Sequence, residues 1–370
     1  MDMDSSPAGL PARDAVLVVG GSLVGLTTAL ALSRAGVAST VLEAAPGERR
    51  GGGIGISTAA LRTVTGHDPR ELPVVSGWRE STGWRDLHRW LAARAGQDPR
   101  ITLHRGVRVR RVGQDGGGAW AVDDLGRRWE APVLLGADGY RSVVRTTVDP
   151  GRPDGQYAGY LLWRGLIDER DLPAGTRPAD GGLSWHDRGD RMMLGYAVPG
   201  DDGSARRGQR AISFACYDPG RRDLLRAAGS LDGHGTVRRS LRESQVPEEI
   251  LTGLAEAARG WDSPWGQAVA TAAATRRVYG TPVVEYLPER LVRGRVAVLG
   301  DAAHVASPMT GHGYATGLED VDALAGALGT DFPGDAVRAL QDYEERRLGP
   351  GRDLVRAGRS WGRDFLARRP

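Results

Sequence analysis

The sequence predicts a protein of the α/β class, α+β overall, with a parallel sheet covered by helices, a second and mostly antiparallel sheet, and a C-terminal helix. Two distant segments, residues 15–20 and 295–301, have the pattern of buried parallel strands, and each leads into a helical segment. The strand-like runs between them are separated by glycine, aspartate and proline turns. A chain of 370 residues is also longer than one hydrophobic core usually holds, so we expect two lobes.

The first predicted elements lie near the N-terminus. Residues 15–20 (AVLVVG) form a short apolar run that ends in glycine, which is typical of a buried parallel strand. The helical pattern from Leu23 to Ala35 stops at Gly36, a common residue just past a helix end. Residues 38–43 (ASTVLE) have the pattern of a second strand that ends in an acid. A strand, a short turn, a helix and a second strand in this order open a dinucleotide-binding fold.

The uncharged run over residues 15–33 approaches the length of a membrane span. A signal peptide needs a basic leading region, but Asp2, Asp4 and Asp14 precede this run and only Arg13 is basic. We therefore interpret the run as a buried strand–turn–helix and expect a cytoplasmic protein without a membrane span.

The middle of the chain changes character. Residues 157–167, 183–198 and 209–217 have strand-like patterns, and many of the aromatic side chains are concentrated there. This pattern predicts a mostly antiparallel sheet, which would form the second lobe. Residues 313–328 predict a helix rich in small side chains. From Asp335 the chain is helical in pattern and rich in arginine, and Gly349-Pro350-Gly351 is expected to break the helix.

Composition excludes several classes of function. The net charge is +3 over the whole chain, so we expect no binding to nucleic acid. Cys216 is the only cysteine, and the seven histidines show no metal-binding spacing, so we expect neither a disulfide framework nor a metal site. The chain contains no lysine, so all 49 basic residues are arginine.

The first motif that indicates chemistry is Gly20-Gly21-Ser22-Leu23-Val24-Gly25. A tight glycine turn before a helix directs backbone N–H groups toward a pyrophosphate. Ser22 stands where the usual pattern has its middle glycine, and serine is small and can itself donate to phosphate. Glu43 ends the next strand, where an acid binds ribose hydroxyls. Alone, the motif leaves open whether the turn binds a dinucleotide or is only structural.

Two further motifs follow in order. The second is Leu134-Leu135-Gly136-Ala137-Asp138-Gly139, continuing to Ser142 and Arg145. The third is Gly300-Asp301-Ala302-Ala303-His304, followed by Pro308, Gly311, Gly313 and Leu318-Glu319-Asp320.

In their order and spacing the three motifs resemble the class A FAD-dependent aromatic hydroxylases of the para-hydroxybenzoate hydroxylase type. The resemblance implies a Rossmann-like FAD-binding domain and a β-sheet substrate domain. It places the FAD-binding domain at residues 1–152 and 286–332, the substrate domain at 153–285, and a C-terminal helical segment at 333–370. It also implies FAD as cofactor, NADH or NADPH as reductant, and O2 as co-substrate. The expected reaction is hydroxylation of an electron-rich aromatic or heteroaromatic ring through a flavin C4a-hydroperoxide.

The resemblance extends to individual residues. Asp301 is expected to hydrogen-bond the ribityl chain, and the turn over residues 308–314 to present its amides to the flavin. In many members of the family, an arginine that lies three residues before a leucine contacts FAD. In this chain Trp84 occupies that position, and Arg85 follows it by one residue. The predicted cofactor-binding residues are Gly20, Gly21, Ser22, Leu23, Gly25, Glu43, Arg50, Arg85, Asp138, Asp301, Gly311, Gly313 and Tyr314.

The Gly-Gly-Ser turn, Ser81-Thr82-Gly83-Trp84 and Leu162-Trp163-Arg164-Gly165 are similar to the 2,6-dihydroxypyridine 3-hydroxylase-like branch of the family. Arg164 could bind an anionic substrate or pair with a carboxylate. No catalytic base is assigned, and the candidates for a catalytic role are His312 and Pro308, with capping of the turn as the alternative for His312. The candidates for the substrate pocket are Trp163, Trp185, Met193, Tyr196, Phe214 and Tyr217, each of which could instead be ordinary sheet core.

Several alternatives stay open at this point. The same fold supports an epoxidase, a Baeyer–Villiger-type oxygenase or a flavin reductase in a biosynthetic pathway. Halogenases of this fold rely on a lysine, which this chain lacks. A non-catalytic flavin-binding protein and a plain NAD-binding protein are further alternatives, and a homodimer is a further hypothesis. Neither the substrate nor the choice between NADH and NADPH follows from the sequence.

Overall fold

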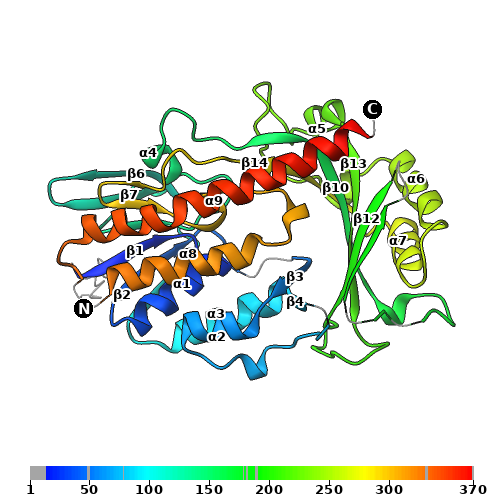
Figure 1. Ribbon diagram of the computed structural model, residues 1–370, viewed down its shortest axis with the longest axis horizontal. Coiled ribbons are helices and arrows are strands. Elements are labelled where there is room, and N and C mark those ends of the chain that lie inside the picture. The colour runs from blue at the N-terminus through cyan, green and yellow to red at the C-terminus, as the bar shows by residue number, and fades with distance from the viewer. Residues whose placement is uncertain are drawn as a thin grey trace, which may run out of the picture.

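The computed structural model describes residues 14–47, 51–77, 79–177, 179–180, 182–187, 191–329 and 332–368. Two lobes lie side by side, and one long C-terminal helix runs along both of them (Figure 1). One lobe contains a mainly parallel sheet with helices, and the other contains an antiparallel sheet. The predicted fold class is confirmed.

The first lobe is built on a six-stranded sheet in the order β15-β16-β9-β1-β2-β5. Its five main strands run parallel, and the edge strand β15 is antiparallel to β16. Every residue of β1, β9 and β16 is buried, as expected for strands covered on both faces. The strands are β1 (Ala15–Val19), β2 (Ala38–Glu43), β5 (Ile101–Arg105), β9 (Leu134–Gly136), β15 (Val292–Arg293) and β16 (Val296–Val298).

Helices cover this sheet, and α1 and α8 lie next to each other on it (Figure 1). The bounds of α8 match the predicted helix, and its glycines let it approach α1 closely. A Cβ at Gly317 would lie 2.9 Å from Val24 Cγ2. The helices of this lobe are α1 (Leu23–Arg34), α2 (Thr58–Thr65), α3 (Trp84–Gln97), α4 (Arg145–Val148) and α8 (Gly313–Leu328). Across the described part of the chain, no helix combines the length and apolar character required to cross a bilayer.

The second lobe confirms the predicted antiparallel sheet. Five strands pair in the order β11-β12-β13-β10-β14, and every pairing is antiparallel. Helices α6 and α7 pack on one face, while the other face is directed toward the first lobe. The elements are β10 (Gln156–Asp168), β11 (Leu183–Asp187), β12 (Met192–Val198), β13 (Ala211–Pro219), β14 (Tyr279–Glu285), α5 (Arg222–Ala227), α6 (Glu248–Ala258) and α7 (Trp265–Ala274).

Smaller elements complete the described chain. A three-stranded sheet, β6-β7-β8, joins the core of the first lobe, and the two-stranded sheet β3-β4 contacts β12 of the second. These elements are β3 (Gly53–Ile56), β4 (Glu80–Gly83), β6 (Val109–Asp115), β7 (Gly118–Asp123) and β8 (Arg128–Ala131). The short 3-10 helices are η1 (Pro69–Glu71), η2 (Glu169–Asp171), η3 (Glu243–Gln245), η4 (Gly300–Ala302) and η5 (Pro308–Thr310).

The expected break at Gly349-Pro350-Gly351 is wrong. Helix α9 (Ala336–Ala367) continues through Pro350 for its full 32 residues. An interior proline removes one helical hydrogen bond and costs about 3 kcal/mol. Packing on both sides of the proline offsets this cost, because Arg347 pairs with Asp320 in the first lobe and Phe365 packs on Tyr160 in the second. Tertiary contacts therefore override the local signal.

Candidate functional site

The three glycine motifs meet at one edge of the parallel sheet. Strands β1, β9 and β16 are neighbours, and they lead directly into Gly20, Ala137-Asp138 and Gly300. The backbone of Leu299 donates to the carbonyl of Gly136, and Ala137 N–H donates to the carbonyl of Val19. In open α/β sheets, ligands bind outside the carboxyl ends of the strands. The motifs therefore form one site and not three separate turns.

Close backbone approach explains the glycines of the first turn. Gly20 has a φ of +104°, and a Cβ there would lie 2.4 Å from the carbonyl oxygen of Ala137. At Gly25 a Cβ would lie 1.8 Å from the carbonyl oxygen of Gly20. A larger side chain at Gly20 would separate the turn from Ala137, and one at Gly25 would separate helix α1 from the turn.

The start of α1 has the features of an anion-binding site. Ser22 is the N-cap of α1, and its side chain makes no capping hydrogen bond. The first N–H groups of a helix lack helical acceptors, and the helix dipole adds partial positive charge there. The turn and Ser22 can therefore donate together to a phosphate group.

Glu43 lies beside the same turn. Its Oε2 accepts from Gly21 N–H at 2.8 Å, and its Oε1 accepts from Ala45 N–H at 2.6 Å. These bonds fix the carboxylate at the end of β2, where ribose hydroxyls bind in dinucleotide-binding folds. The structure thus brings Glu43 and the glycine turn together as predicted.

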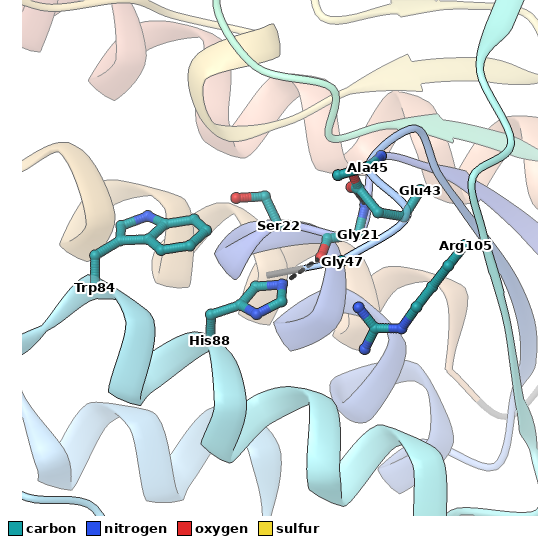
Figure 2. A pocket seen from close by; sticks show the side chains of 8 residues that line it. All are labelled: Gly21, Ser22, Glu43, Ala45, Gly47, Trp84, His88 and Arg105. Atoms are coloured by element: carbon teal, nitrogen blue, oxygen red, sulfur yellow. Dashed lines mark hydrogen bonds between the residues drawn. The ribbon is translucent and has the colours of Figure 1, made fainter. Parts of the chain in front are cut away.

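A pocket opens next to this turn (Figure 2). His88 lies on α3 and its Nε2 is 3.1 Å from the carbonyl oxygen of Gly21, so this nitrogen donates the hydrogen bond. Trp84 stacks on the His88 ring with centroids 5.1 Å apart. The lining residues are Gly21, Ser22, Glu43, Ala45, Gly47, Trp84, His88 and Arg105.

Sequence reasoning missed three side chains of this pocket: Trp84, His88 and Arg105. Trp84 occupies the position at which many members of the family have an arginine that contacts FAD, and in the structure it lines the pocket. Arg105 ends β5 and pairs in register with Glu43, so its place could have been found once β5 was aligned with β2. His88 follows Trp84 by one helical turn, a spacing that puts both on one face.

The predicted contact of Arg85 gains no support from the geometry. Its guanidinium forms an ion pair with Asp201 of the second lobe at 3.0 Å, and it is not among the residues that line the pocket. Arg50 lies outside the described residues.

Asp138 and Arg145 stabilise the second motif. The Asp138 carboxylate accepts from Ser142 Oγ at 2.5 Å and from Val143 N–H at 2.7 Å, so it caps the turn before α4. Burial raises the pKa of Asp138, although these hydrogen bonds act in the opposite direction. Arg145 is 1% exposed and donates to the carbonyls of Tyr140 and Ala302. Arg145 therefore ties the second motif to the third.

A buried ionic network supports the third motif. His304 Nε2 lies 2.6 Å from Asp320 Oδ2, and Arg347 Nε donates to Asp320 Oδ1 at 2.8 Å. Gly300 N–H donates to Asp320 at 2.9 Å. Burial lowers the pKa of His304, but the charge and hydrogen bond of Asp320 outweigh it and raise the pKa overall. His304 is therefore structural, whereas the exposed Asp301 remains available to a ligand.

The turn after the third motif lies at the start of α8. Gly311 has a φ of +62°, and the Arg79 guanidinium donates to its carbonyl at 3.1 Å. Arg79 also lies 3.3 Å from His312 Nε2. Tyr314 is buried and its hydroxyl bonds to Thr27 at 3.0 Å, so Tyr314 joins α8 to α1. Pro308 is exposed at the start of η5.

The substrate candidates divide between the two faces of the antiparallel sheet. Trp163, Met193 and Phe214 lie in the core formed with α6 and α7. These three are thus core residues on the face away from the first lobe. Tyr196 and Tyr217 lie on the opposite face, and Tyr196 donates to the carbonyl of Gly53 at 2.6 Å. Trp185, on edge strand β11, is 48% exposed, and its ring centroid lies 6.2 Å from that of Tyr217.

These features fit FAD. The glycine turn admits a close backbone approach, the start of α1 is suited to a pyrophosphate, and Glu43 is suited to a ribose. The exposed Asp301 lies at the carboxyl end of a strand two places away in the sheet. No cluster of residues suited to a metal ion occurs within the described ranges.

Comparison with known proteins identifies the family. A family model described as FAD binding domain matches residues 79–357. Phenazine 1,6-dicarboxylic acid hydroxylase PhzS of Lysobacter antibioticus is 29% identical over 392 residues, covering 93% of this chain and 89% of that protein. The 3-amino-4-hydroxybenzoate 2-monooxygenase of Streptomyces cremeus is 27% identical over 385 residues, covering 95% and 87%. The structure of 2,6-dihydroxypyridine-3-hydroxylase from Arthrobacter nicotinovorans aligns with a TM-score of 0.77 at 24% identity, covering 96% and 93%.

The fold and the site define a flavin-dependent oxidoreductase with a second, antiparallel sheet. The chain belongs to the FAD binding domain family. It is an FAD-dependent monooxygenase of the aromatic hydroxylase type.

Proposed function

We propose that this enzyme uses NADH or NADPH and O2 to hydroxylate an electron-rich aromatic or heteroaromatic substrate. The observation that supports this most directly is the convergence of Gly20, Asp138 and Gly300 at adjacent strand ends. The antiparallel sheet of the second lobe faces this site, and it supplies aromatic and polar side chains to the boundary between the lobes.

In this proposal the cofactor-binding residues have separate roles. The amides of Ser22 and Leu23 at the start of α1 bind the pyrophosphate, and Glu43, which Gly21 N–H holds in place, binds ribose hydroxyls. Gly20 and Gly25 permit that approach.

The third motif serves the flavin end of the cofactor. Asp301 would bind the ribityl chain, and the amides of Gly313 and Tyr314 at the start of α8 would stabilise negative charge on the reduced ring. The Gly311 amide donates to the carbonyl of Pro308, so Gly311 would act by shaping the turn. Asp138 acts indirectly by fixing the turn beside Gly20.

FAD supplies the redox chemistry, activating O2 after its reduction by the pyridine nucleotide. The protein must hold the aromatic ring in position and exclude water from the reacting atoms. Hydroxylation of an electron-rich ring needs little acid–base help from side chains. His312 and Pro308, at the turn next to α8, are the residues we propose to contact the reacting ring.

The test is a combination of cofactor analysis and turnover. The purified protein should be yellow, with FAD near one equivalent per chain. A panel of phenols, hydroxypyridines, purines and aminobenzoates should then be screened for acceleration of flavin reduction. Active compounds should cause NAD(P)H oxidation with matched O2 uptake, and label from ¹⁸O2 should enter the product.

Other outcomes point to other functions. Substrate turnover without O2 consumption would indicate a reductase, and insertion of labelled oxygen into a ring ketone would indicate Baeyer–Villiger chemistry. Stable FAD binding with no substrate-dependent oxidation would indicate a flavin-binding protein without catalysis. A colourless protein that rejects added FAD would overturn the proposal.

We also propose a cytoplasmic homodimer. Dependence on NAD(P)H supports a cytoplasmic location. The large exposed side chains Leu183 and Trp185 on edge strand β11 support self-association, since such groups are enriched at interfaces. Sedimentation analysis of the holoenzyme measures the oligomeric state directly.

A further inference from the structure

One polar cluster interrupts the apolar face of the antiparallel sheet that is directed toward the FAD-binding lobe. Arg164 on β10 pairs in register with Ala215 of β13 and with Tyr279 of β14. Tyr196 and Tyr217 lie on the same face, on β12 and β13. Apolar side chains such as Leu162 and Met192 lie beside them on that face.

The guanidinium of Arg164 has no acidic partner among the described residues. Its electrostatic neighbours are the side chains of Tyr279, Tyr196 and Tyr217. Burial lowers the pKa of Arg164, but the interactions with these tyrosines outweigh it and raise the pKa overall. The side chain is therefore a permanent cation that is only partly exposed to solvent, and burying a cation is costly unless an anion joins it.

Tyr217 provides a second, independent observation. It is 4% exposed, and its hydroxyl has no hydrogen-bond partner among the described residues. A buried hydroxyl that lacks a partner costs about 1–3 kcal/mol. Such groups are rare in native proteins, and a ligand that accepts a hydrogen bond would remove the cost.

The cluster also lies next to the cofactor-binding lobe. A Cβ at Gly52 would be 3.1 Å from Arg164 Nη2, 3.4 Å from the Tyr279 hydroxyl and 3.5 Å from Ser213 Oγ. Gly53 N–H donates to Ser213 Oγ at 3.2 Å. The segment that leads from the FAD-binding lobe into β3 therefore lies directly on the cluster, so a group bound by Arg164 would be at the boundary of the two lobes.

We propose that Arg164, together with the hydroxyls of Tyr217 and Tyr279, binds an oxyanion of the aromatic substrate, either a carboxylate or an ionised ring hydroxyl. This inference rests on the proposed function and names the substrate class: the ring is anionic. The donor set contains a forked cation and hydroxyl donors but no carboxylate, which suits an acceptor with two oxygens or one charged oxygen.

The test uses matched pairs of probes on the FAD-loaded enzyme, with the dissociation constant measured from the change in the flavin absorption spectrum. The carboxylate arm compares salicylate with salicylamide. The ring-hydroxyl arm compares 2,6-dihydroxypyridine with 2,6-dimethoxypyridine. We expect the wild-type enzyme to bind the anionic member of at least one pair about tenfold or more tightly, and Arg164→Met to abolish that preference. Arg164→Lys should retain part of it.

A second variant, Tyr217→Phe, separates a loss of anion binding from a loss of folding. Its hydroxyl makes no bond within the described chain, so the variant should keep the wild-type melting temperature and FAD content while its affinity for the preferred probe falls several-fold. Arg170→Met is the matched control, because Arg170 follows the same strand but pairs with Asp168 at the exposed surface. This control should leave the probe preference unchanged.

The outcomes separate the inference from the proposed function. Equal or better binding of the neutral probes, no binding of any acid at millimolar concentration, or an unchanged preference in Arg164→Met would overturn the anionic site. In each of these cases, intact FAD binding and O2-dependent turnover of a neutral ring would leave the monooxygenase function standing. A protein that binds no FAD would instead overturn the proposed function itself.

Discussion

At the scale of single residues, Gly25 limits how closely α1 can approach the cofactor-binding turn. An alanine Cβ would lie 1.8 Å from the carbonyl oxygen of Gly20, so either the helix or the turn must move. Overpacking of this kind costs about 1–3 kcal/mol, and here the displaced groups are those expected to bind the pyrophosphate. We expect Gly25→Ala to weaken FAD binding about tenfold or more, measured by titration of the apoprotein.

Gly96→Ala is the control for this prediction. Gly96 is exposed in helix α3 and a Cβ there meets no atom within 4 Å. Alanine in a helix interior is favoured over glycine by roughly 0.5–1 kcal/mol, so the control should bind FAD normally and be slightly more stable. Normal FAD affinity in Gly25→Ala would contradict the close-approach argument.

Residue identity alone could not decide which side chains face the substrate. Trp163 and Met193 have the size and apolar character of pocket residues, but α6 and α7 cover their face of the sheet. Side chains alternate between the two faces along each strand, and both faces of this sheet are covered. The alternation therefore divides the side chains into two groups but does not show which group faces the cofactor. Tyr196 and Tyr217, from the same group of candidates, lie on the other face.

At the scale of elements, α9 shows where packing overrides local sequence. Pro350 is exposed within α9, so replacing it with alanine restores a helical hydrogen bond and removes no buried contact. We expect Pro350→Ala to raise the free energy of unfolding by about 1–3 kcal/mol. Thermal melting of the holoenzyme at a fixed scan rate checks this.

The neighbouring glycines serve as controls for the proline variant. A Cβ at Gly351 would lie 2.8 Å from His304 Cδ2, so Gly351→Ala should lower the melting temperature. Gly349 has no atom within 4 Å of such a Cβ, so Gly349→Ala should be neutral or slightly stabilising. A melting temperature of Pro350→Ala below that of the wild type would show that the proline belongs to the packing of α9.

The His304–Asp320 pair gives the stability a predictable pH dependence. The pKa of His304 is raised above 6.5 in the folded protein, so its contribution is fully present below pH 6.5 and is lost as the pH rises through the folded value. The pKa of Asp320 is lowered from 3.8, so its contribution is present above 3.8 and is lost as the pH falls through the lowered value.

We therefore expect His304→Gln to reduce the melting temperature more at about pH 6 than at about pH 9. His234→Gln, at an exposed position, controls for loss of a histidine elsewhere. A deficit in His304→Gln that is constant across this pH range would show that the pKa of His304 is not raised in the folded protein.

At the scale of the whole molecule, the order of motifs was enough to predict the fold. Buried strands at 15–20 and 295–301 could be recognised because both faces of a parallel sheet require apolar side chains. The meeting of the glycine turn with Glu43 was predictable, because both signals directly follow strands of the parallel sheet. Arg105 can be placed only once β5 is aligned with β2, and His88 only once α3 is packed beside the turn, so both depend on contacts between separate elements.

The boundary between the lobes likewise depends on long-range contacts. Ser81 Oγ donates to the carbonyl of Ala197 at 2.7 Å, and Tyr196 donates to the carbonyl of Gly53 at 2.6 Å. These hydrogen bonds attach the two-stranded sheet β3-β4 to the antiparallel sheet. Hydrogen bonds between residues so far apart in sequence leave no local pattern, so this boundary became visible only in the structure.

Gly53 is where this boundary can be tested. A Cβ there would lie 2.5 Å from Tyr196 Cε2 and 2.6 Å from Val198 Cγ1, so alanine would push β3 away from the antiparallel sheet. The Cβ at Gly53 would contact only side chains of the antiparallel sheet and not the glycine turn at Gly20, so FAD should still bind. The ring of the substrate and the cofactor would, however, be held apart or at the wrong angle. We expect Gly53→Ala to retain FAD while kcat/KM falls about tenfold or more.

Gly55→Ala is the matched control on the same strand, since a Cβ there meets only the carbonyl oxygen of Glu80 at 3.9 Å. It should keep both FAD content and turnover. Stopped-flow reduction of each holoenzyme by NAD(P)H, with and without substrate, separates the two effects. In Gly53→Ala the substrate should no longer accelerate flavin reduction, although reduction without substrate persists. Loss of FAD from Gly53→Ala would show that the segment around Gly53 belongs to the cofactor site alone. If the substrate still accelerates reduction at the wild-type rate, contact at Gly53 does not couple the two lobes.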